Sequence, residues 1–387
     1  MKRSKFVFVI ESQFPCVSGG IENWLYNIIR NIPNNVDVKV ISEESTRGIS
    51  PFYDISVQQA HYPSLRKNRL LSFLFRRPLR WIEILFVGNK ILRVLNSVVD
   101  DPSKTFIFCL STMAPSTAGL KYKSQNPSAC VICSSRGPHA EVEAAHNKWL
   151  KNWLFGIEKN NVLNSDIFFV NGFDMADYYK NLYDRLGIVL KNGVDIHRFD
   201  IKHDTPYPIK DKKIILSVGT LIDIKGVNEL IKAFALIKDT TDTVVCFLGK
   251  GNPKRYIDLA YSLKVEDKVY FLGSTQNVVP YLQNADVITC LSGGGGFAMA
   301  ALEAMCSKTP IIAWDSAVYH QFNNEIKTMK LVPEKNIEML ADAIVTVLKE
   351  PDSFKQLTNN AYILAKKFDW KIVVEEMFNY CEEYDID

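Results

Sequence analysis

Residues 293–296 are four consecutive glycines between an apolar run and a stretch of good helix formers that holds one acid, Glu303. This order predicts a strand at 285–291, a glycine loop and a helix at 297–306. Glycine lets the backbone approach a ligand, and the free amides at the start of a helix attract anions, above all phosphate. The pattern therefore predicts a diphosphate site with a carboxylate on its helix. A loop that merely needs positive φ angles is the alternative.

A second succession of strand, glycines and helix lies near the start of the chain. The apolar run 6–10 leads through a loop to Gly19 and Gly20, and a helix with one apolar face is expected at 21–32. Each half of the chain thus contains a strand, a glycine loop and a helix in this order. The loop at Gly19 and Gly20 is therefore a second candidate for contact with a ligand.

Arg136 and His139 follow directly after a strand expected at 129–133. Open parallel sheets bind ligands beyond the carboxyl ends of their strands, so both are candidate site residues. His139 is the best candidate for an acid, a base or a hydrogen-bond donor among the six histidines. The alternative for a single loop histidine is a structural role.

The elements that would position these residues alternate between short apolar strands and helices, which predicts doubly wound parallel α/β sheets. The polar segment 200–213, with Pro206 and Pro208, is the expected linker. Further strands are expected at 36–42, 106–110, 167–170, 214–219, 244–248, 269–272 and 309–314, and helices at 228–237 and 370–384.

Composition limits the class of protein. The chain has 387 residues, of which 47% are hydrophobic and 23% charged, as in soluble proteins of two or three domains. No apolar stretch is long enough to span a bilayer, and the scattered cysteines in apolar contexts favour reduced thiols in the cytoplasm. Cys130 and Cys133 have the spacing of a metal pair, but residues three apart in a strand point to opposite faces, so no metal site is expected.

Residues 61–95 carry most of the basic excess of the first half, with eight Lys or Arg and one acid, Glu83. From Trp81 onward the apolar residues share one predicted helical face; they are Ile84, Leu85, Ile91, Leu92 and Leu95. Such a helix can lie on an anionic membrane surface, or it can be a core helix with a solvated basic rim. Nucleic acid is a less favoured partner, because the segment has no nucleic-acid-binding motif.

Six segments, in order, resemble motifs of the family-four retaining GT-B glycosyltransferases. They are 15–22 (PCVSGGIE), 192–195 (NGVD) with Phe199, 217–226 (SVG to KG), 271–273 (FLG), 285–287 (ADV), and 296–297 (GF) with 302–305 (LEAM). The resemblance covers nearly the whole chain and is weakest over 45–125. It implies two doubly wound Rossmann-like domains facing across a cleft: 1–200 on the acceptor side, 201–370 for the nucleotide-sugar, and a helix at 371–387 that packs back on the first domain.

The resemblance also assigns roles in the site. Lys225 would neutralise the donor diphosphate, and Glu303 would hydrogen-bond the ribose hydroxyls. Other donor contacts would come from the backbone at Gly296 and Phe297 and from Gly19 and Gly20 in the opposite loop. Arg136 is a further candidate for donor binding because of its place after a strand. His139 and Lys225 are the catalytic candidates. No metal or cofactor is expected, because a lysine, backbone amides and a helix end can meet the charge that develops on the diphosphate.

Two positions depart from the family pattern. Thr220 stands where similar proteins commonly have an arginine, and Gly295 stands where they commonly have a glutamate that contacts the donor sugar. One diphosphate cation and one sugar contact are therefore missing from the pattern. The pair of carboxylates that ordinary glycosidases use is not present either.

The leading hypothesis is a glycosyltransferase that moves a sugar from a nucleoside-diphosphate sugar to a cell-envelope or capsule polysaccharide precursor, with retention of configuration. The acceptor would be lipid-linked or another glycan, and the protein would act in the cytoplasm, peripherally at an anionic membrane surface through residues 61–95. One alternative is a catalytically weakened GT-B scaffold or nucleotide-binding subunit. A nucleotide-sugar epimerase of related fold is disfavoured, because the carboxylates do not cluster at strand ends.

Overall fold

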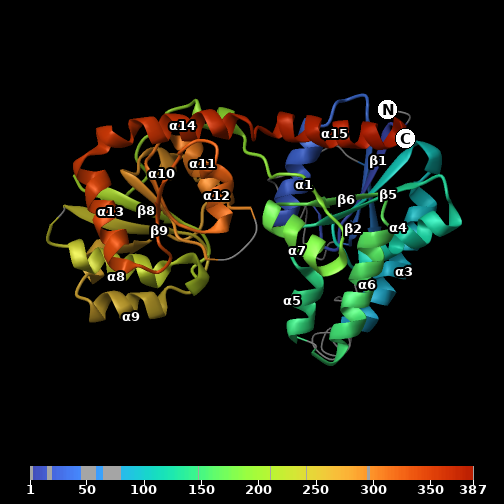
Figure 1. Ribbon diagram of the computed structural model, residues 1–387, viewed down its shortest axis with the longest axis horizontal. Coiled ribbons are helices and arrows are strands. Elements are labelled where there is room, and N and C mark those ends of the chain that lie inside the picture. Colours follow the sequence, from blue (N-terminus) through green and yellow to red (C-terminus); the bar gives the residue numbers. More distant parts are fainter. Residues whose placement is uncertain are drawn as a thin grey trace. The chain divides into compact units, whose positions relative to one another are not determined.

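The computed structural model describes residues 3–14, 20–44, 58–63, 80–146, 148–209, 211–240, 242–293 and 297–386. The chain forms two units. The first unit comprises Met1–Gly193 and Trp370–Asp387, and the second comprises Val194–Asp369. Each unit has a parallel sheet with helices packed on it (Figure 1), so the α/β class predicted from the sequence is confirmed in both.

The sheet of the first unit has seven strands in the order β3-β2-β1-β4-β5-β6-β7. They are β1 (Lys5–Val9), β2 (Asp37–Glu43), β3 (Gln58–Tyr62), β4 (Thr105–Cys109), β5 (Cys130–Ser135), β6 (Ile167–Val170) and β7 (Ile188–Val189). The strand order changes direction between β1 and β4, which pair in parallel from Lys5 with Thr105 to Val9 with Cys109. Such a switch point opens a crevice at the carboxyl ends of the strands.

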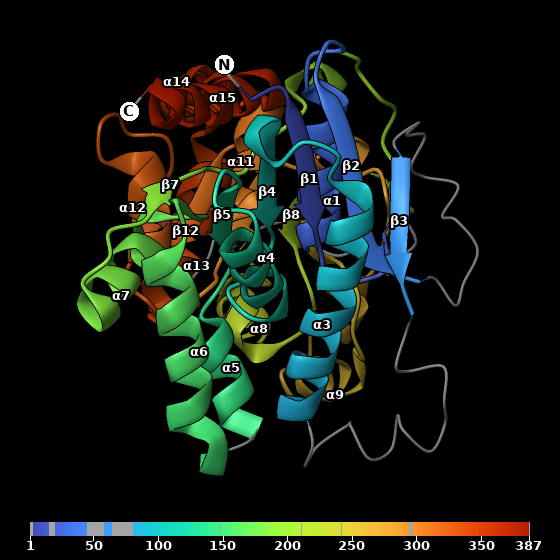
Figure 2. The same ribbon diagram turned by 90° about the vertical axis from the view of Figure 1, so that its right-hand side faces the viewer.

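Helices cover both faces of this sheet: α1 (Gly20–Asn31), α3 (Arg80–Val98), α4 (Ala114–Gln125), α5 (His139–His146), α6 (Lys151–Asn164), α7 (Phe173–Tyr183) and α15 (Trp370–Ile386). Alternate residues of β1 separate the two cores. Phe6 and Phe8 pack with α1 and α15, whereas Val7 and Val9 pack with α3 and α4. Figure 2 shows α3, α4, α5 and α6 beside one another on their side of the sheet.

Helix α15 is part of the first unit although it ends the chain. Its residues Trp370, Val373 and Met377 are buried in the core that α1 shares with the sheet, and α15 contacts α1 (Figure 1). The side chain of Arg3 pairs with Asp385, and the Tyr384 hydroxyl donates to Asp166 over 2.6 Å. The first unit is therefore completed by the last turns of the chain.

The apolar face predicted for the basic segment 61–95 is mostly buried. Ile91 and Leu95 are fully buried against the sheet and α4, and Ile84 is buried in a neighbouring cluster. Leu85 was expected on the same face, but it is 41% exposed. The described part of this helix is thus a core helix with a solvated rim. Residues 64–79, which hold five of the basic residues, lie outside the described residues.

The sheet of the second unit has six strands in the order β10-β9-β8-β11-β12-β13. They are β8 (Lys213–Val218), β9 (Thr243–Leu248), β10 (Val269–Phe271), β11 (Val287–Cys290), β12 (Ile311–Trp314) and β13 (Lys330–Val332). All neighbouring strands are parallel. The switch point here lies between β8 and β11.

The helices of the second unit form two layers. One layer contains α8 (Val227–Ile237), α9 (Lys254–Ser262) and α13 (Ile337–Lys349). The other contains α10 (Val279–Gln283), α11 (Met299–Ser307) and α14 (Lys355–Lys366), and the unit also has α12 (Ala317–Asn323). Figure 1 shows the strands between these layers.

Three strands, β3, β7 and β13, were not predicted from the sequence. β3 contains Gln58, Gln59 and His61, and β7 has only two residues, so neither has the apolar run that marks a buried strand.

Within the described ranges, no helix is long and apolar enough to cross a membrane, and no group of His, Cys, Asp or Glu could hold a metal ion. Cys130 and Cys133 are both buried, but they belong to different cores on the two faces of the sheet. Burial raises the pKa of the Cys133 thiol to about 12.

Candidate functional site

Lys225 lies at the switch point of the second unit. It ends a short 3-10 turn, Asp223–Lys225, in the connection after β8, and its ammonium donates to Ser292 Oγ over 3.2 Å in the connection after β11. Ile224 accepts a backbone hydrogen bond from Gly293 of 3.0 Å. The loop that carries the lysine is therefore fastened to the start of the glycine loop.

Glycines make this close approach possible. Gly226 has a φ of 71°, and a β-carbon there would overlap Leu291. A β-carbon on Gly249, after β9, would overlap the carbonyl oxygen of Gly219, after β8. The connections after the strands of this unit thus approach each other backbone to backbone. As a result, main-chain N–H and C=O groups lie near the lysine.

The surroundings of Lys225 contain no counter-ion among the described residues: Ser292 is its hydrogen-bond partner, and no carboxylate lies within ion-pair distance. The Tyr319 hydroxyl accepts a hydrogen bond from the Ser292 amide over 3.1 Å, which fixes the loop that faces the lysine. A half-buried ammonium without an acid is available to an anionic ligand.

Glu303 lies in the middle of α11, the helix after the glycine loop. It is half-buried, and it makes no hydrogen bond with the described residues. Burial raises the pKa of its carboxyl to about 7, while the charge of Arg198 opposes this shift. Arg198 itself donates to Asn277 over 3.0 Å. An acid without a partner in this position can hydrogen-bond a ligand's hydroxyl groups.

Phe297 does not direct its side chain to a ligand. Its ring packs edge to face against Phe322 and beside Phe368, with centroid distances of 5.4 and 5.8 Å, so only its backbone can serve the predicted contact. Helix α11 begins at Met299, two residues later than the sequence predicts. Gly295 and Gly296 lie outside the described residues.

In the first unit, polar residues follow the carboxyl ends of β1, β4, β5, β6 and β7. Glu11 follows β1, Thr112 follows β4, Arg136 follows β5, and Asn171 and Asn192 follow β6 and β7. Glu11 accepts hydrogen bonds of 3.2 Å from the Ser111 hydroxyl and the Ala114 amide, so it holds the start of α4. Parallel sheets bind ligands at this edge.

Arg136 is a half-buried cation that forms no ion pair with an acid of the described residues. Its guanidinium lies over the ring of Trp24, with 3.7 Å from Cζ to the ring centroid, and Nη1 donates to Asn192 Oδ1 over 3.0 Å. Nε and Nη2 are buried and have no hydrogen-bond partner. Burial lowers the pKa of Arg136 to about 9, which leaves it charged at neutral pH. Such a group is suited to an anion.

The predicted glycine loop before α1 is described only in part. Gly20 is the first residue of α1, and a β-carbon there would meet nothing within 4 Å, so packing inside the described structure does not require this glycine. Gly19 lies outside the described residues.

His139 begins α5 and is connected to a buried carboxylate. Its Nδ1 lies 3.0 Å from Thr112 Oγ1, and Thr112 Oγ1 donates to Glu158 Oε1 over 2.7 Å. Burial lowers the pKa of His139 to about 4, so the imidazole is neutral at physiological pH. Among the described residues Nε2 has no hydrogen-bond partner. The ring can therefore exchange a hydrogen bond with a ligand through this atom.

Sequence reasoning missed Thr112, Glu158 and Ser292, although each carried a signal. Thr112 and Ser292 follow predicted strands, as Arg136 does. Glu158 is one helical turn from both Leu154 and Val162, which are buried in α6. A glutamate at that spacing on the apolar face of a helix is a candidate for a buried carboxylate.

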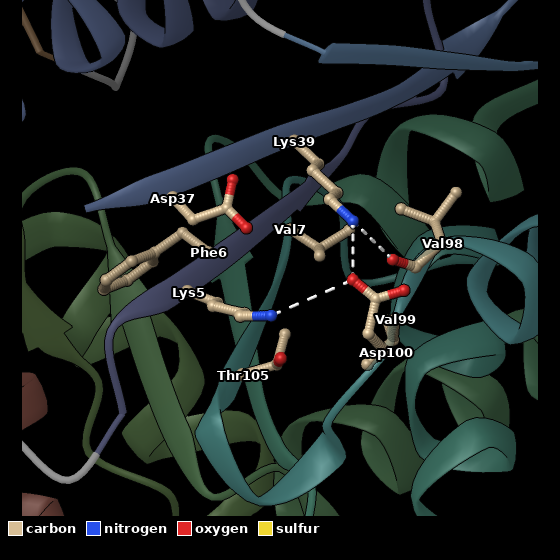
Figure 3. A pocket seen from close by; sticks show the side chains of 9 residues that line it. All are labelled: Lys5, Phe6, Val7, Asp37, Lys39, Val98, Val99, Asp100 and Thr105. Atoms are coloured by element: carbon tan, nitrogen blue, oxygen red, sulfur yellow. Dashed lines mark hydrogen bonds and ion pairs between the residues drawn. The ribbon is translucent and has the colours of Figure 1, made fainter. Parts of the chain in front are cut away.

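Two hollows elsewhere do not fit a nucleotide-sugar. The first lies at the amino ends of β1, β2 and β4, where Asp100 points to Lys39, 3.0 Å away, and to Lys5, 3.8 Å away (Figure 3). Its volume is about 10 Å³, which suits one water molecule. The second, of about 290 Å³ between α4 and α6, has no charged lining residue; it is lined by Thr117, Trp153, Gly156, Ile157, Asn160 and Asn161.

The second unit matches a known family. Residues 200–363, which include Lys225 and Glu303, match the profile of the family described as glycosyl transferases group 1. This part of the chain is therefore similar to the group 1 glycosyl transferases. The predicted resemblance is confirmed for this part of the chain.

Several curated relatives of the chain are glycosyltransferases by name. An uncharacterized glycosyltransferase of Methanocaldococcus jannaschii is 29% identical over 205 residues, which are 49% of this chain and 52% of the relative. The N-acetylgalactosamine-N,N'-diacetylbacillosaminyl-diphospho-undecaprenol 4-alpha-N-acetylgalactosaminyltransferase of Campylobacter jejuni is 28% identical over 195 residues, which are 50% of this chain and 52% of the relative. The chain thus spans about half the length of these curated relatives.

Solved structures match over the whole chain and show the fold. Sucrose-phosphate synthase from Thermosynechococcus elongatus superposes with a TM-score of 0.76 at 16% identity, with 100% of both chains covered. Anabaena HepE in complex with UDP-glucose superposes with a TM-score of 0.73 at 15% identity, covering 98% of this chain and 99% of that one. The predicted GT-B fold is confirmed.

Proposed function

We propose that the protein is a glycosyltransferase that takes a sugar from a nucleoside-diphosphate sugar and transfers it, with retention of configuration, to an envelope or capsule polysaccharide precursor. The observation that carries this proposal is Lys225, whose ammonium has no counter-ion among the described residues. It lies at the switch point of the second unit, within the segment that matches the group 1 family, and is hydrogen-bonded to the loop before α11. HepE, which has the same fold, has been solved with UDP-glucose.

In the proposed reaction, different residues bind the diphosphate, the ribose and the other polar groups of the substrates. The bond between the anomeric carbon and the diphosphate oxygen breaks, a bond to an acceptor oxygen forms, and the acceptor's proton is released. Charge grows on the departing diphosphate, and Lys225 with the amides of the neighbouring loops stabilises it. Glu303 binds the ribose hydroxyls, Arg136 binds an anionic group of the donor, and His139 interacts with a substrate hydroxyl. Gly19, Gly20 and Gly296 remain proposed backbone contacts. No metal is required in this scheme.

The acceptor is proposed to be a lipid-linked sugar, by analogy with the Campylobacter jejuni relative, whose name specifies a diphospho-undecaprenol-linked substrate. Association with an anionic membrane surface would then bring enzyme and acceptor together. Because the apolar face of α3 is largely buried, this contact would depend on basic side chains and on exposed apolar ones such as Phe86.

The test is a transfer assay with a panel of nucleotide-sugars and lipid-linked or free glycan acceptors, read by mass. The proposal expects one donor class to give a glycosylated product of retained configuration and Lys225→Ala to reduce its formation strongly. Lys232→Ala, an exposed lysine on α8, is the matched control. The absence of any nucleotide binding would refute the proposal.

A binding or scaffold subunit is the second candidate, because Thr220 replaces the expected arginine and is exposed in the loop after β8. It predicts nucleotide binding without product. A product whose formation depends on Lys225 would exclude it.

A further inference from the structure

Glu158 is a fully buried carboxylate that is held by hydrogen bonds alone. Oε1 accepts from the Thr112 hydroxyl over 2.7 Å, the Ala140 amide over 3.2 Å and the Tyr179 hydroxyl over 3.1 Å, and Oε2 accepts from the Tyr183 hydroxyl over 3.1 Å. No lysine or arginine of the described chain pairs with it. The two tyrosine hydroxyls each have a second acceptor within reach, because Tyr179 Oη also lies 3.3 Å from the Gly137 carbonyl oxygen and Tyr183 Oη lies 3.2 Å from that of Phe155. The donors that converge on Glu158 fit a carboxylate whose oxygens accept hydrogen bonds.

This carboxylate determines the direction of the next hydrogen bond. A threonine hydroxyl has one proton to donate. Because that proton is directed to Glu158, Thr112 Oγ1 offers only lone pairs to His139. The imidazole nitrogen 3.0 Å away, Nδ1, must then carry a proton and donate it.

One contact opposes this assignment, and its donor–acceptor distance is longer. The Thr112 amide also points to His139 Nδ1, at 3.4 Å, which would favour a lone pair on that nitrogen. The hydroxyl contact is shorter by 0.4 Å, and the bond of the same hydroxyl to a carboxylate is charge-assisted, which makes it about twice as strong as a neutral one. The shorter hydrogen bonds, from Thr112 Oγ1 to Glu158 and from His139 Nδ1 to Thr112 Oγ1, therefore decide the assignment.

We propose that Thr112 and Glu158 are positioning residues that hold His139 as the neutral Nδ1–H tautomer, so that Nε2 is a hydrogen-bond acceptor for a substrate hydroxyl. The second part of this proposal rests on the proposed function. The position of His139 at the first residue of α5 supports the neutral ring, because the positive end of a helix disfavours an imidazolium. No bond is made or broken; the relay fixes which ring nitrogen carries the lone pair.

The tautomer can be measured without any substrate. Protein labelled with ¹⁵N-histidine is compared with the His139→Gln variant, and the signals that disappear belong to residue 139. The proposal expects a protonated Nδ1 and an unprotonated Nε2 at pH 7. A protonated Nε2 overturns it.

Two variants of Thr112 test the relay. Thr112→Ser keeps the hydroxyl and is expected to keep the tautomer, whereas Thr112→Val removes the hydroxyl and is expected to give a mixture. Thermal unfolding and circular dichroism establish that both variants are folded. An unchanged single tautomer in folded Thr112→Val overturns the role of Thr112, and Glu158→Leu applies the same test to the carboxylate.

Transfer rates then test the functional part. Thr112→Val is expected to lower kcat/KM by up to roughly tenfold, the factor that corresponds to one net hydrogen bond. Thr112→Ser should restore most of the rate, and Thr112→Val should have no further effect in a His139→Gln background. Additive losses in the double variant overturn the functional part. If the wild-type protein transfers no sugar, the proposed function fails, while the tautomer measurement still decides the relay.

Discussion

The guanidinium of Arg136 stacks on the indole ring of Trp24 and leaves two of its nitrogens, Nε and Nη2, buried and without a hydrogen-bond partner among the described residues. The ring supplies part of the attraction that water would supply, but a cation–π contact is worth only about 0.5–2 kcal/mol. Removing a charge from water without pairing it costs several kcal/mol. The first unit thus retains a group that is unfavourable for its own stability, which is typical of a binding residue.

Replacing Arg136 should separate stability from function. Arg136→Met keeps the length of the side chain and removes the unpaired charge, so we expect an unchanged or raised Tm together with a loss of sugar transfer of roughly tenfold or more, since a buried anion–guanidinium contact is worth about 1.5–3 kcal/mol. Thermal unfolding and the transfer assay measure the two effects. Arg30→Met is the control, because Arg30 also stacks on a ring of α1, Tyr26, but is exposed. A large drop in Tm with activity retained would contradict the interpretation.

Lys225 should contribute to binding of the diphosphate and not to folding. Its ammonium has Ser292 as partner and no acid among the described residues, so Lys225→Ala is expected to leave the unfolding temperature nearly unchanged. Affinity for nucleoside diphosphates should fall by about tenfold or more, from the loss of a charge-assisted contact of about 1.5–3 kcal/mol. Isothermal titration with UDP and GDP measures this. Equal affinities for Lys225→Ala and the exposed control Lys232→Ala would show that Lys225 does not bind the diphosphate.

Much of the fold could be predicted because buried parallel strands appear as short apolar runs. β6 was predicted with its observed bounds, and most other core strands were shifted by a residue or two. The polar edge strand β3 and the two-residue β7 gave no such run. The role of Leu85 was wrong because helical spacing identifies a face but not its width: Ile91 and Leu95 meet the sheet, and Leu85 lies beyond the edge of the contact.

Candidate site residues could be predicted where they come shortly after a strand in the sequence. They could not be predicted where a contact depends on the packing of distant segments. Arg136 and His139 lie in the connection after β5, as expected from the sequence, and Lys225 lies in the connection after β8. Their roles in a site stay predictions. The link between His139 and Glu158 spans the connection after β4 and two helices, so no local pattern contains it. Likewise, only the folded chain shows that Phe297 uses its ring for the core.

Glu303 should make donor binding depend on pH. Its pKa is raised from an ordinary value of 4.5 to about 7, so below pH 7 the free protein holds a carboxylic acid, and above pH 7 a carboxylate that can accept from both ribose hydroxyls. Affinity for a nucleotide-sugar is therefore expected to rise by about tenfold between pH 6 and pH 8, in proportion to the ionised fraction. A nucleotide-sugar is the appropriate ligand, because the terminal phosphate of a free nucleoside diphosphate, like other phosphate monoesters, titrates near pH 6.

The matched variant for this pH dependence is Glu303→Gln, which keeps the shape and cannot ionise. Its affinity should be lower at pH 8 and nearly constant across the range. Folding stability gives the opposite slope for the wild type: the folded state holds a proton that the unfolded state has lost, so stability falls as pH rises from about 4.5 to about 7. A pH dependence of binding that persists unchanged in Glu303→Gln would assign it to another group.

Gly193 should be required for the return of the C-terminal helix to the first unit. A β-carbon at this position would lie 2.5 Å from Cδ2 and 2.6 Å from Cε3 of Trp370, the first residue of α15. The ring cannot withdraw freely, because it is buried in the core with Val373 and Met377. Gly193→Ala is therefore expected to destabilise the protein by about 1–3 kcal/mol through overpacking.

Chemical denaturation measures this loss of stability. The control is Gly156→Ala in the middle of α6, where a β-carbon meets nothing within 4 Å. Alanine stabilises a helix interior relative to glycine by roughly 0.5–1 kcal/mol, so the two variants should shift the denaturation midpoint in opposite directions. Shifts in the same direction would mean that Trp370 can repack around the added methyl group.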